Sequence, residues 1–236
     1  MNYSNQMEFL AKRKDLRDPT IVDSWKLILS AEEIKMFVKK CANVINSKFE
    51  GKDIVVVCIL KGAVYFFVDL TRELNIPYST YFIEATSYHN GQTQSETLSI
   101  MGSIEPSKFV NKHVILVDEL FDNGHTMEQI KMAIHEKASV PLDKIFTCTL
   151  FIKNKETSCP EPDLYGVIVP NVWLVGYGLD DKQEKRGWTH LFACPKCADV
   201  PESEDDIIFK DSLAYDQMRK ELFCPVCLAC SKRTVD

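Results

Sequence analysis

The chain has 236 residues, of which 45% are hydrophobic and 26% are charged, and its formal net charge is -6. This acidic balance argues against a general binder of nucleic acids or membrane surfaces, and no apolar run approaches the length of a membrane span. The polar first residues do not resemble a signal peptide, so we expect a globular cytoplasmic protein of one or two domains.

The first 29 residues mix charges with short apolar runs, which predicts an irregular or short-strand arm. A helix is expected next, because Ser30 and Glu33 have the spacing of a capping box. Apolar residues then recur at helical spacing: Ile34, Phe37, Val38, Cys41, Val44 and Ile45. They predict a surface helix with one buried face.

Three largely apolar runs have the length and composition of buried strands: residues 54–60, 114–117 and 145–152. Helical spacing follows the first run over residues 63–74 and the second from Met127 onward. This alternation predicts an α/β fold with a mostly parallel twisted sheet flanked by helices.

Two weaker segments lie between the first and second of these runs. Residues 79–85 alternate partially and predict a further strand, and residues 100–102 predict the start of a hairpin arm. The polar residues 86–95 between them predict a mobile surface loop.

The segment 118–126 joins the second apolar run to its helix and combines three carboxylates with one glycine. Gly124, the helix N-terminus and Thr126 suit a phosphate group, because they provide close backbone approach and hydrogen-bond donors. Asp118 and Glu119 suit ribose hydroxyls and Mg²⁺. This chemistry indicates a phosphorylated sugar site, and the alternative is a solvated acidic turn before an ordinary helix.

The same segment resembles the phosphoribosyl-pyrophosphate signature of type I phosphoribosyltransferases. Asp118 and Glu119 match its acidic pair, and residues 122–126 match its Asp-Thr-Gly-x-Thr. The resemblance implies that the acidic pair and the residues Asn123, Gly124, His125 and Thr126 bind the ribose phosphate. Asn123 stands where the family usually has Thr, which removes one hydroxyl donor that backbone groups and the Asn amide can replace.

A second match is to hypoxanthine-guanine phosphoribosyltransferases, in which a Leu-Lys-Gly-Gly segment binds pyrophosphate. Residues 60–63 here read Leu-Lys-Gly-Ala, so the resemblance assigns Lys61 and Gly62 to pyrophosphate and implies a cis peptide bond before Lys61. Without the other motifs, this segment would be an ordinary helix-entry loop. In the same family a Ser-Tyr pair lies in the lid over the reaction, and Ser87 and Tyr88 fall in that place.

The resemblance also supplies a purine site. Lys153 follows Phe-Ile as a family lysine that donates to the purine O6, a choice that favours 6-oxopurines over adenine. Trp173 takes the place of the aromatic residue that stacks on the base, with core packing as the alternative, and Leu174 would supply backbone hydrogen bonds. Asp122 falls where an acid faces purine N7, which makes it the candidate catalytic base.

Two charged residues after residue 179 complete the expected site. Asp180 matches an acid that binds a second Mg²⁺, in addition to the one expected at Asp118 and Glu119, and Arg186 matches an arginine that contacts pyrophosphate. The alternative for this charged run is an exposed loop.

The C-terminal segment departs from the family. Cys194 and Cys197 form one Cys-x-x-Cys pair, and Cys224 and Cys227 form a second. Four thiolates in a cytosolic protein suit a structural Zn²⁺ site, but the long spacing leads us to favour free thiols.

The resemblance implies a single type I phosphoribosyltransferase domain over residues 1–236. Its core would span about residues 30–169, a small hood would combine about 1–29 with 170–192, and a cysteine-rich extension would follow over 193–236. The expected function is purine salvage: a 6-oxopurine (guanine, hypoxanthine or xanthine) and phosphoribosyl pyrophosphate give the nucleoside 5′-monophosphate and pyrophosphate. A homodimer or homotetramer with no nucleic-acid or membrane partner is also implied. Two alternatives stay open, a phosphoribosyl-pyrophosphate-sensing regulator and an inactive assembly module.

Overall fold

The computed structural model describes residues 25–88, 97–101 and 103–194. Its helices are α2 (Ala31–Lys48), α3 (Val64–Glu73) and α4 (His125–Ala138), with short 3-10 turns η2 (Pro106–Lys108) and η3 (Leu142–Lys144). Its strands are β1 (Lys26–Leu29), β2 (Ile54–Leu60), β3 (Tyr78–Tyr88), β4 (Thr97–Met101), β5 (His113–Phe121), β6 (Ile145–Lys153), β7 (Leu164–Val169), β8 (Leu174–Val175) and β9 (Leu191–Ala193).

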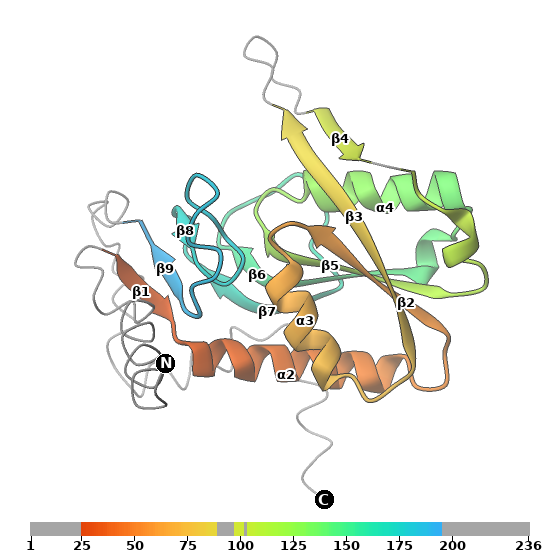
Figure 1. The fold of residues 1–236 in the computed structure, drawn as a ribbon, viewed down its shortest axis with the longest axis horizontal. Helices are drawn as coiled ribbons and strands as arrows, with labels where there is room; N and C mark the ends of the chain where they lie inside the picture. The colour runs from red at the N-terminus through yellow and green to blue at the C-terminus, as the bar shows by residue number, and fades with distance from the viewer. Residues whose placement is uncertain (1–24, 89–96, 102, 195–236) are drawn as a thin grey trace, which may run out of the picture.

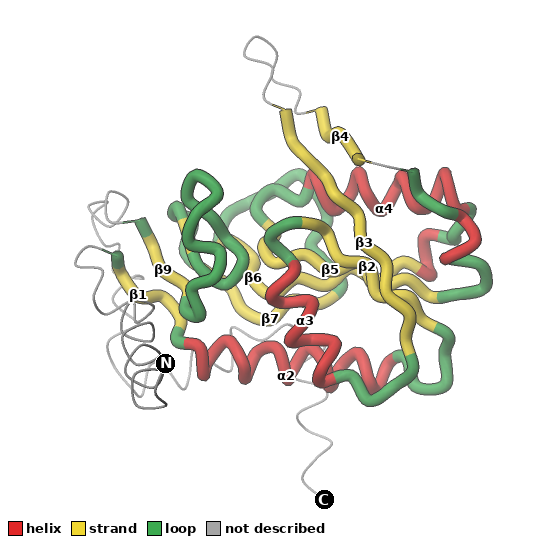
Figure 2. Tube along the Cα trace, in the orientation of Figure 1, coloured by secondary structure: helices red, strands yellow, loops and turns green. Residues whose placement is uncertain are grey.

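Within the described part of the chain, six strands form one sheet in the order β4-β3-β2-β5-β6-β7. All neighbours pair in parallel except β4, which forms an antiparallel hairpin with β3. Helices α2 and α3 cover one face of this sheet and α4 covers the other (Figures 1 and 2). The carboxyl ends of the parallel strands therefore meet at one edge, where ligands of α/β folds bind.

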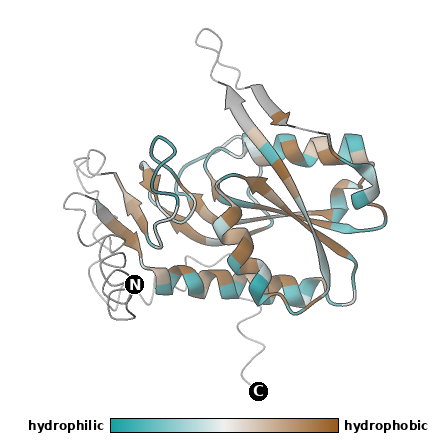
Figure 3. Ribbon diagram, in the orientation of Figure 1, coloured by the Kyte–Doolittle hydropathy of each residue, from teal (hydrophilic) through white to brown (hydrophobic). Residues whose placement is uncertain are grey.

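The core consists of two apolar layers, one on each face of the sheet. One layer joins β2, β5 and β6 to α2 and α3, and the other joins the same strands to α4. Figure 3 shows the hydrophobic strands and the more hydrophilic loops and outer helix faces. Since each fully buried aliphatic side chain contributes about 1.5–3 kcal/mol, these layers hold the sheet edge rigidly in place.

Helix α2 begins and packs as its sequence predicts. The Ser30 amide donates to Oε2 of Glu33 at 2.9 Å, and the Glu33 amide donates to Oγ of Ser30 at 3.3 Å, which completes the capping box. The whole predicted stripe from Ile34 to Ile45 is buried. Helix α2 packs against β6 and β7.

A second, three-stranded sheet in the order β1-β9-β8 lies beside the main one. Its middle strand, Leu191–Ala193, pairs in antiparallel register with Lys26–Leu29 on one side and with Leu174–Val175 on the other. We call this sheet and the loop between β8 and β9 the hood. The Ala31 amide donates to Nδ1 of His190 at 2.7 Å and ties the hood to the start of α2.

Three predicted boundaries were wrong. Strand β5 does not end at Val117 but continues to Phe121, because its register with β6 extends from Asp118 opposite Thr149 to Phe121 opposite Ile152. Strand β3 continues to Tyr88, because β4 pairs with the residues that were expected to form the loop. Helix α4 begins at His125, two residues before the predicted start. In the two strands, hydrogen bonding to a neighbouring strand outweighs the polar composition of the segment.

Candidate active site

Asp118 and Glu119 lie in the last half of β5, at the carboxyl edge of the sheet. The Glu119 amide donates to Oδ1 of Asp118 at 3.0 Å. Burial raises the pKa of Asp118 well above its ordinary value, and the negative charge of Glu119 adds to the increase. Burial also raises the pKa of Glu119, although its hydrogen bond with Asp118 and the charge of Arg186 oppose the increase. Burial therefore disfavours the charged form of both carboxyl groups, and a cation bound between them would favour it.

The loop after β2 packs directly against this pair. The peptide bond between Leu60 and Lys61 is cis, as the family resemblance implied. A Cβ atom at Gly62 would lie 1.8 Å from Oε1 of Glu119, so a side chain there would displace the carboxyl group. A Cβ atom at Gly178, where φ is 101°, would lie 2.2 Å from the Gly62 carbonyl oxygen. The β2–α3 loop, the end of β5 and the hood therefore meet at one point.

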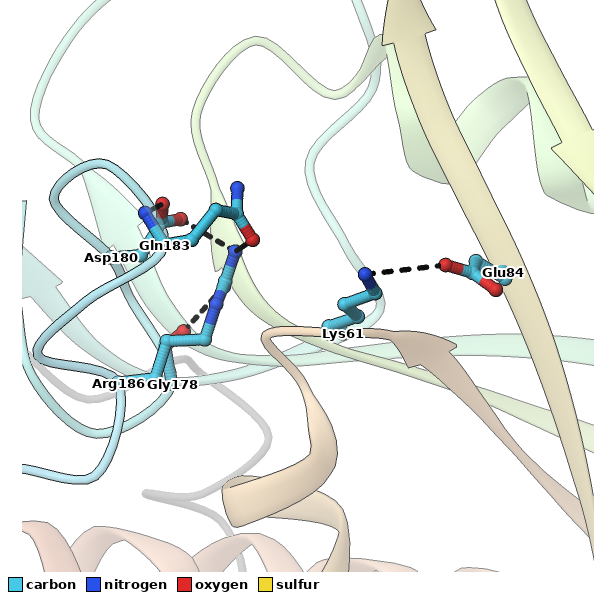
Figure 4. A network of polar contacts seen from close by, with 6 residues as sticks. All are labelled: Lys61, Glu84, Gly178, Asp180, Gln183 and Arg186. Carbon is cyan, nitrogen blue, oxygen red and sulfur yellow. Dashed lines mark hydrogen bonds and ion pairs between the residues drawn. The ribbon is translucent and has the colours of Figure 1, made fainter.

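The hood brings Asp180 and Arg186 to this point as an ion pair. Their closest atoms, Oδ1 of Asp180 and a guanidinium nitrogen of Arg186, are 2.7 Å apart. Arg186 also donates to the Gly178 carbonyl oxygen at 2.8 Å, and the Gln183 amide donates to Oδ2 of Asp180 at 2.7 Å (Figure 4). The carboxylate and the guanidinium group are thus fixed before any ligand arrives.

Lys61 stands across from this network in Figure 4. Its side chain is 65% exposed, and its ammonium nitrogen lies 3.7 Å from Oε1 of Glu84 on β3. An ion pair this long and exposed is weak, so pyrophosphate oxygens would compete for the ammonium group.

The loop between β5 and α4 has the form of an anion cradle. Gly124 has a positive φ of 81° and precedes the first residue of α4, so the free amides of the helix start next to it. Oδ1 of Asn123 accepts a hydrogen bond from the His125 amide at 3.1 Å. The residue that replaces the family Thr therefore caps the start of the helix. Thr126 lies in the first turn of α4 and is partly buried.

Asp122 is held by two lysines. Nζ of Lys153 donates to its Oδ2 at 3.2 Å, and the Lys155 ammonium group forms an ion pair with its Oδ1. Partial burial raises the pKa of Asp122. The hydrogen bonds and charges of Lys155 and Lys153 lower it by more than burial raises it, so the pKa lies below its ordinary value. Asp122 is therefore ionised and faces the lysine that was predicted to select the base.

Trp173 is 54% exposed, so its indole ring is available for stacking. Leu174 is buried, and its strand β8 is an edge strand of the hood sheet, which leaves unpaired backbone groups on the outer side of the strand. No described contact joins Trp173 or Leu174 to Lys153.

Ser87 and Tyr88 have strand backbones, with Ser87 opposite Leu98 and Tyr88 opposite Thr97, and their lid role stays a prediction.

Three contacts at the site had not been predicted from the sequence. Glu84 pairs with Lys61, Lys155 pairs with Asp122, and the Cys159 sulfur lies 3.3 Å from Nδ1 of His125. A charged residue inside the expected strand 79–85 was the one signal for Glu84. Lys155 and Cys159 lie in a polar segment with no periodicity, so no pattern in the sequence selects them.

The candidate metal ligands suit Mg²⁺, which needs few ligands from the protein, better than a metal ion whose ligands all come from protein side chains. Among the described residues no three His, Cys, Asp or Glu side chains are grouped to hold a metal ion. Mg²⁺ is commonly bound by one or two carboxylates together with substrate phosphates, which the pair Asp118 and Glu119, or Asp180, can provide. The predicted zinc site is untested: Cys194 is a free thiol, and Cys197, Cys224 and Cys227 lie outside the described residues.

The described residues include no helix with both the length and the apolar composition needed to cross a membrane.

Comparisons with known proteins show the family to which this chain belongs. A family model for the phosphoribosyl transferase domain matches residues 24–182, which end before the cysteine-rich segment. The hypoxanthine-guanine phosphoribosyltransferase of Aquifex aeolicus is 35% identical over 158 residues, which cover 66% of this chain and 86% of the relative. The hypoxanthine phosphoribosyltransferase of Haemophilus influenzae is 27% identical over 171 residues, which cover 70% and 92%.

Solved structures share the fold. A hypoxanthine-guanine phosphoribosyltransferase from Bacillus anthracis, with a HEPES molecule in its active site, has a TM-score of 0.63 at 28% identity and covers 72% of this chain and 98% of its own. A hypoxanthine phosphoribosyltransferase from Staphylococcus aureus has a TM-score of 0.65 at 24% identity, with coverage of 75% and 95%.

Proposed function

The chain belongs to the phosphoribosyl transferase domain family, and from this premise we propose that it is a purine salvage enzyme. It transfers the phosphoribosyl group of phosphoribosyl pyrophosphate to a 6-oxopurine and releases pyrophosphate. Guanine and hypoxanthine are the proposed bases, and xanthine is a third candidate. The relatives that are 35% and 27% identical carry names of this activity, which supports the proposal.

One observation carries this proposal: Lys153, the lysine expected to select the base, contacts Asp122 at the start of the phosphoribosyl loop, 3.2 Å away. Lys153 is the last residue of β6, and Asp122 directly follows the last residue of the adjacent parallel strand β5. A base held by Lys153 would therefore lie next to a sugar held by the residues that precede and follow Asp122. Base transfer requires this proximity, because it brings N9 of the purine to the anomeric carbon.

The residues around the acid pair would hold the sugar and the leaving group. Asp118 and Glu119 accept hydrogen bonds from the ribose hydroxyls, and the amides of Gly124 and Thr126 bind the 5′-phosphate. Lys61, Gly62 and Arg186 bind pyrophosphate. Mg²⁺, held by Asp118, Glu119 or Asp180, would neutralise charge on the pyrophosphate.

Asp122 acts at the base. Its depressed pKa keeps it ionised, so it accepts the proton or the partial positive charge that develops on the imidazole ring as N9 attacks. Lys153 donates to O6 of the purine, and the exposed indole ring of Trp173 stacks on the base. The lid with Ser87 and Tyr88 would exclude water, which would otherwise intercept the ribosyl cation.

We further propose that the enzyme is cytoplasmic and forms homodimers or homotetramers. Cys58, Cys148, Cys159 and Cys194 are free thiols, which persist in a reducing compartment. Tyr65, Val68 and Phe82 are exposed on the adjacent elements α3 and β3, where a second copy would cover them. Light scattering on the purified protein measures the assembly.

Nucleotide formation tests the function. The purified chain is incubated with phosphoribosyl pyrophosphate, MgCl₂ and each of guanine, hypoxanthine, xanthine and adenine, and product is measured by chromatography. We expect product with at least one 6-oxopurine and none above background with adenine. Binding of phosphoribosyl pyrophosphate without product from any base would contradict the enzyme and support the sensing regulator instead.

A further inference from the structure

Lys155 is the unassigned charged side chain closest to the reaction centre. It lies two residues beyond Lys153, where the chain leaves β6 and turns. The Lys155 amide donates to the Lys153 carbonyl oxygen at 2.9 Å, and the Asn154 amide donates to the Val169 carbonyl oxygen at 2.8 Å. This turn is therefore fixed at both ends, and it directs the Lys153 and Lys155 side chains to one carboxylate.

Beyond Lys155, the connection between β6 and β7 contacts the loop between β5 and α4. Cys159 contacts the ring of His125 through its sulfur at 3.3 Å, and a Cβ atom at Gly124 would lie 2.7 Å from Cβ of Cys159. Oγ1 of Thr157 donates to the Cys159 carbonyl oxygen at 3.0 Å. Lys155 thus belongs to a segment that is held against residues 122–125.

The two oxygens of Asp122 have different partners. Oδ2 receives the hydrogen bond from Lys153, and the ion pair with Lys155 is to Oδ1. Oδ1 is shielded from solvent and receives no other hydrogen bond from the described residues, while the Asp122 side chain as a whole is 47% exposed. A shielded carboxylate oxygen is costly without a counter-charge, and Lys155 provides it.

Lys153 cannot serve Asp122 and the purine equally well. In the proposed reaction its ammonium group donates to O6, which weakens its hold on Oδ2 at the moment when Asp122 must be ionised. We propose that Lys155 is the positioning residue that keeps Asp122 ionised and oriented through Oδ1, so that Lys153 is free to bind O6 and Oδ2 is free to face the base. This inference rests on the proposed function.

The other charged groups near Asp122 do not replace Lys155. On β5, Asp118 and Glu119 are acidic and would raise the pKa of a neighbouring carboxyl group. Glu161 lines the same small cavity of about 80 Å³ as both lysines and is also acidic. On α4, the His125 ring contacts Cys159. Burial raises the pKa of Asp122, and the cations that lower it are Lys155 and Lys153.

The test uses the full chain with Lys155→Met, which removes the charge, and Lys155→Arg, which keeps it. Lys108→Met, at an exposed position on η2, is the matched control. Carbon NMR follows the Asp122 carboxyl group through a pH titration, and steady-state kinetics with guanine give kcat and KM across the same pH range. Lys155→Gln replaces the Met variant if that variant fails to fold.

We expect Lys155→Met to raise the pKa of Asp122 and to move the acid limb of the kcat profile to higher pH by the same amount. At neutral pH kcat should fall about tenfold, as for the loss of one hydrogen bond to a charged group, with the KM for phosphoribosyl pyrophosphate unchanged. Lys155→Arg should restore both values, and Lys108→Met should change neither.

An unchanged pKa of Asp122 and an unchanged acid limb in the Met variant would overturn the assignment. So would a loss of kcat that Lys155→Arg does not restore, since a structural role alone would explain it. The NMR titration reports on Lys155 whether or not nucleotide is formed. A wild-type chain that forms no nucleotide from any base, with the predicted pKa shift still observed, would contradict the proposed function instead.

Discussion

Two groups of carboxylates lie within five residues of each other at the end of β5, and their surroundings drive their pKa values in opposite directions. Asp118 and Glu119 are buried next to each other, and burial raises both pKa values. Asp122 is also partly buried, but Lys155 and Lys153 lower its pKa below the ordinary value. Opposite shifts in neighbouring carboxyls are typical of a site that divides its tasks. In the proposed reaction the first group binds the sugar and the cation, and the second acts on the base.

Asp122→Asn should remove the carboxylate that acts on the base and leave the acid pair Asp118 and Glu119 intact. We expect turnover to fall by about 10²–10⁴-fold, the usual contribution of a positioned base, because the amide cannot accept the charge from the purine ring. The dissociation constant of phosphoribosyl pyrophosphate should change little. Single-turnover kinetics and calorimetry measure the two quantities, and Asp143→Asn, at an exposed position on η3, is the control. Equal losses in turnover and binding would show that Asp122 belongs to the sugar site.

Lys153→Met should separate base selection from sugar binding. The kcat/KM for guanine should fall by about 10- to 100-fold, the range for a hydrogen bond to a charged group, because O6 loses its donor. The already low activity with adenine should not fall further, since adenine has no oxygen at this position. Competition assays with both bases measure the ratio, and Lys108→Met serves as the control. A variant that keeps the wild-type ratio would remove Lys153 from the base site.

The affinity for phosphoribosyl pyrophosphate with Mg²⁺ should increase with pH, because the raised pKa values of Asp118 and Glu119 mean that ligand and proton compete. Binding is weakest below these pKa values, strengthens by up to about tenfold per pH unit and per proton released, and levels off above them. Calorimetry in two buffers of different ionisation enthalpy measures the protons released. Release that is the same in Asp118→Asn as in the wild type would contradict this account of the acid pair.

The smallest expected effect is on stability. A carboxyl group whose pKa is raised on folding contributes stability below its unfolded pKa, and that contribution is lost as pH rises through the folded pKa. Asp118→Asn should therefore raise the Tm at neutral pH by about 2–4 °C, the shift for about 1 kcal/mol in a domain of this size. Thermal unfolding across pH measures this effect. A lower Tm in the variant would mean that Asp118 stabilises the fold at neutral pH, which would contradict this prediction.

The fold was predictable because its signals are local and periodic. The apolar runs became β2, β5 and β6, and the Ser30 capping box and the stripe of α2 were confirmed. The family resemblance of residues 118–126 was confirmed by the match to residues 24–182. The ends of β3 and β5 were not predicted, because they are fixed by pairing with other strands, β4 and β6, and not by the composition of the segments themselves.

The sequence placed Lys153 and Asp122 in one candidate site, and the structure brings Nζ of Lys153 to 3.2 Å from Oδ2 of Asp122, while the roles of both residues stay predictions. The sequence did not predict the partner of each charge, because Lys155 and Cys159 lie in an irregular segment whose path depends on its anchors at Val169 and Gly124. It also did not predict that the pKa values of the acid pair and of Asp122 shift in opposite directions, since all three are carboxyl groups on one short stretch. Only their packing sets the opposite pKa shifts.

A crystal structure of the chain with guanosine 5′-monophosphate would test the division of tasks most directly. We expect Nζ of Lys153 within hydrogen-bonding distance of O6, the ribose hydroxyls on Asp118 and Glu119, and the 5′-phosphate on the amides of residues 123–126. A nucleotide bound with its ribose on the lysines, or with these side chains turned away from it, would contradict the account.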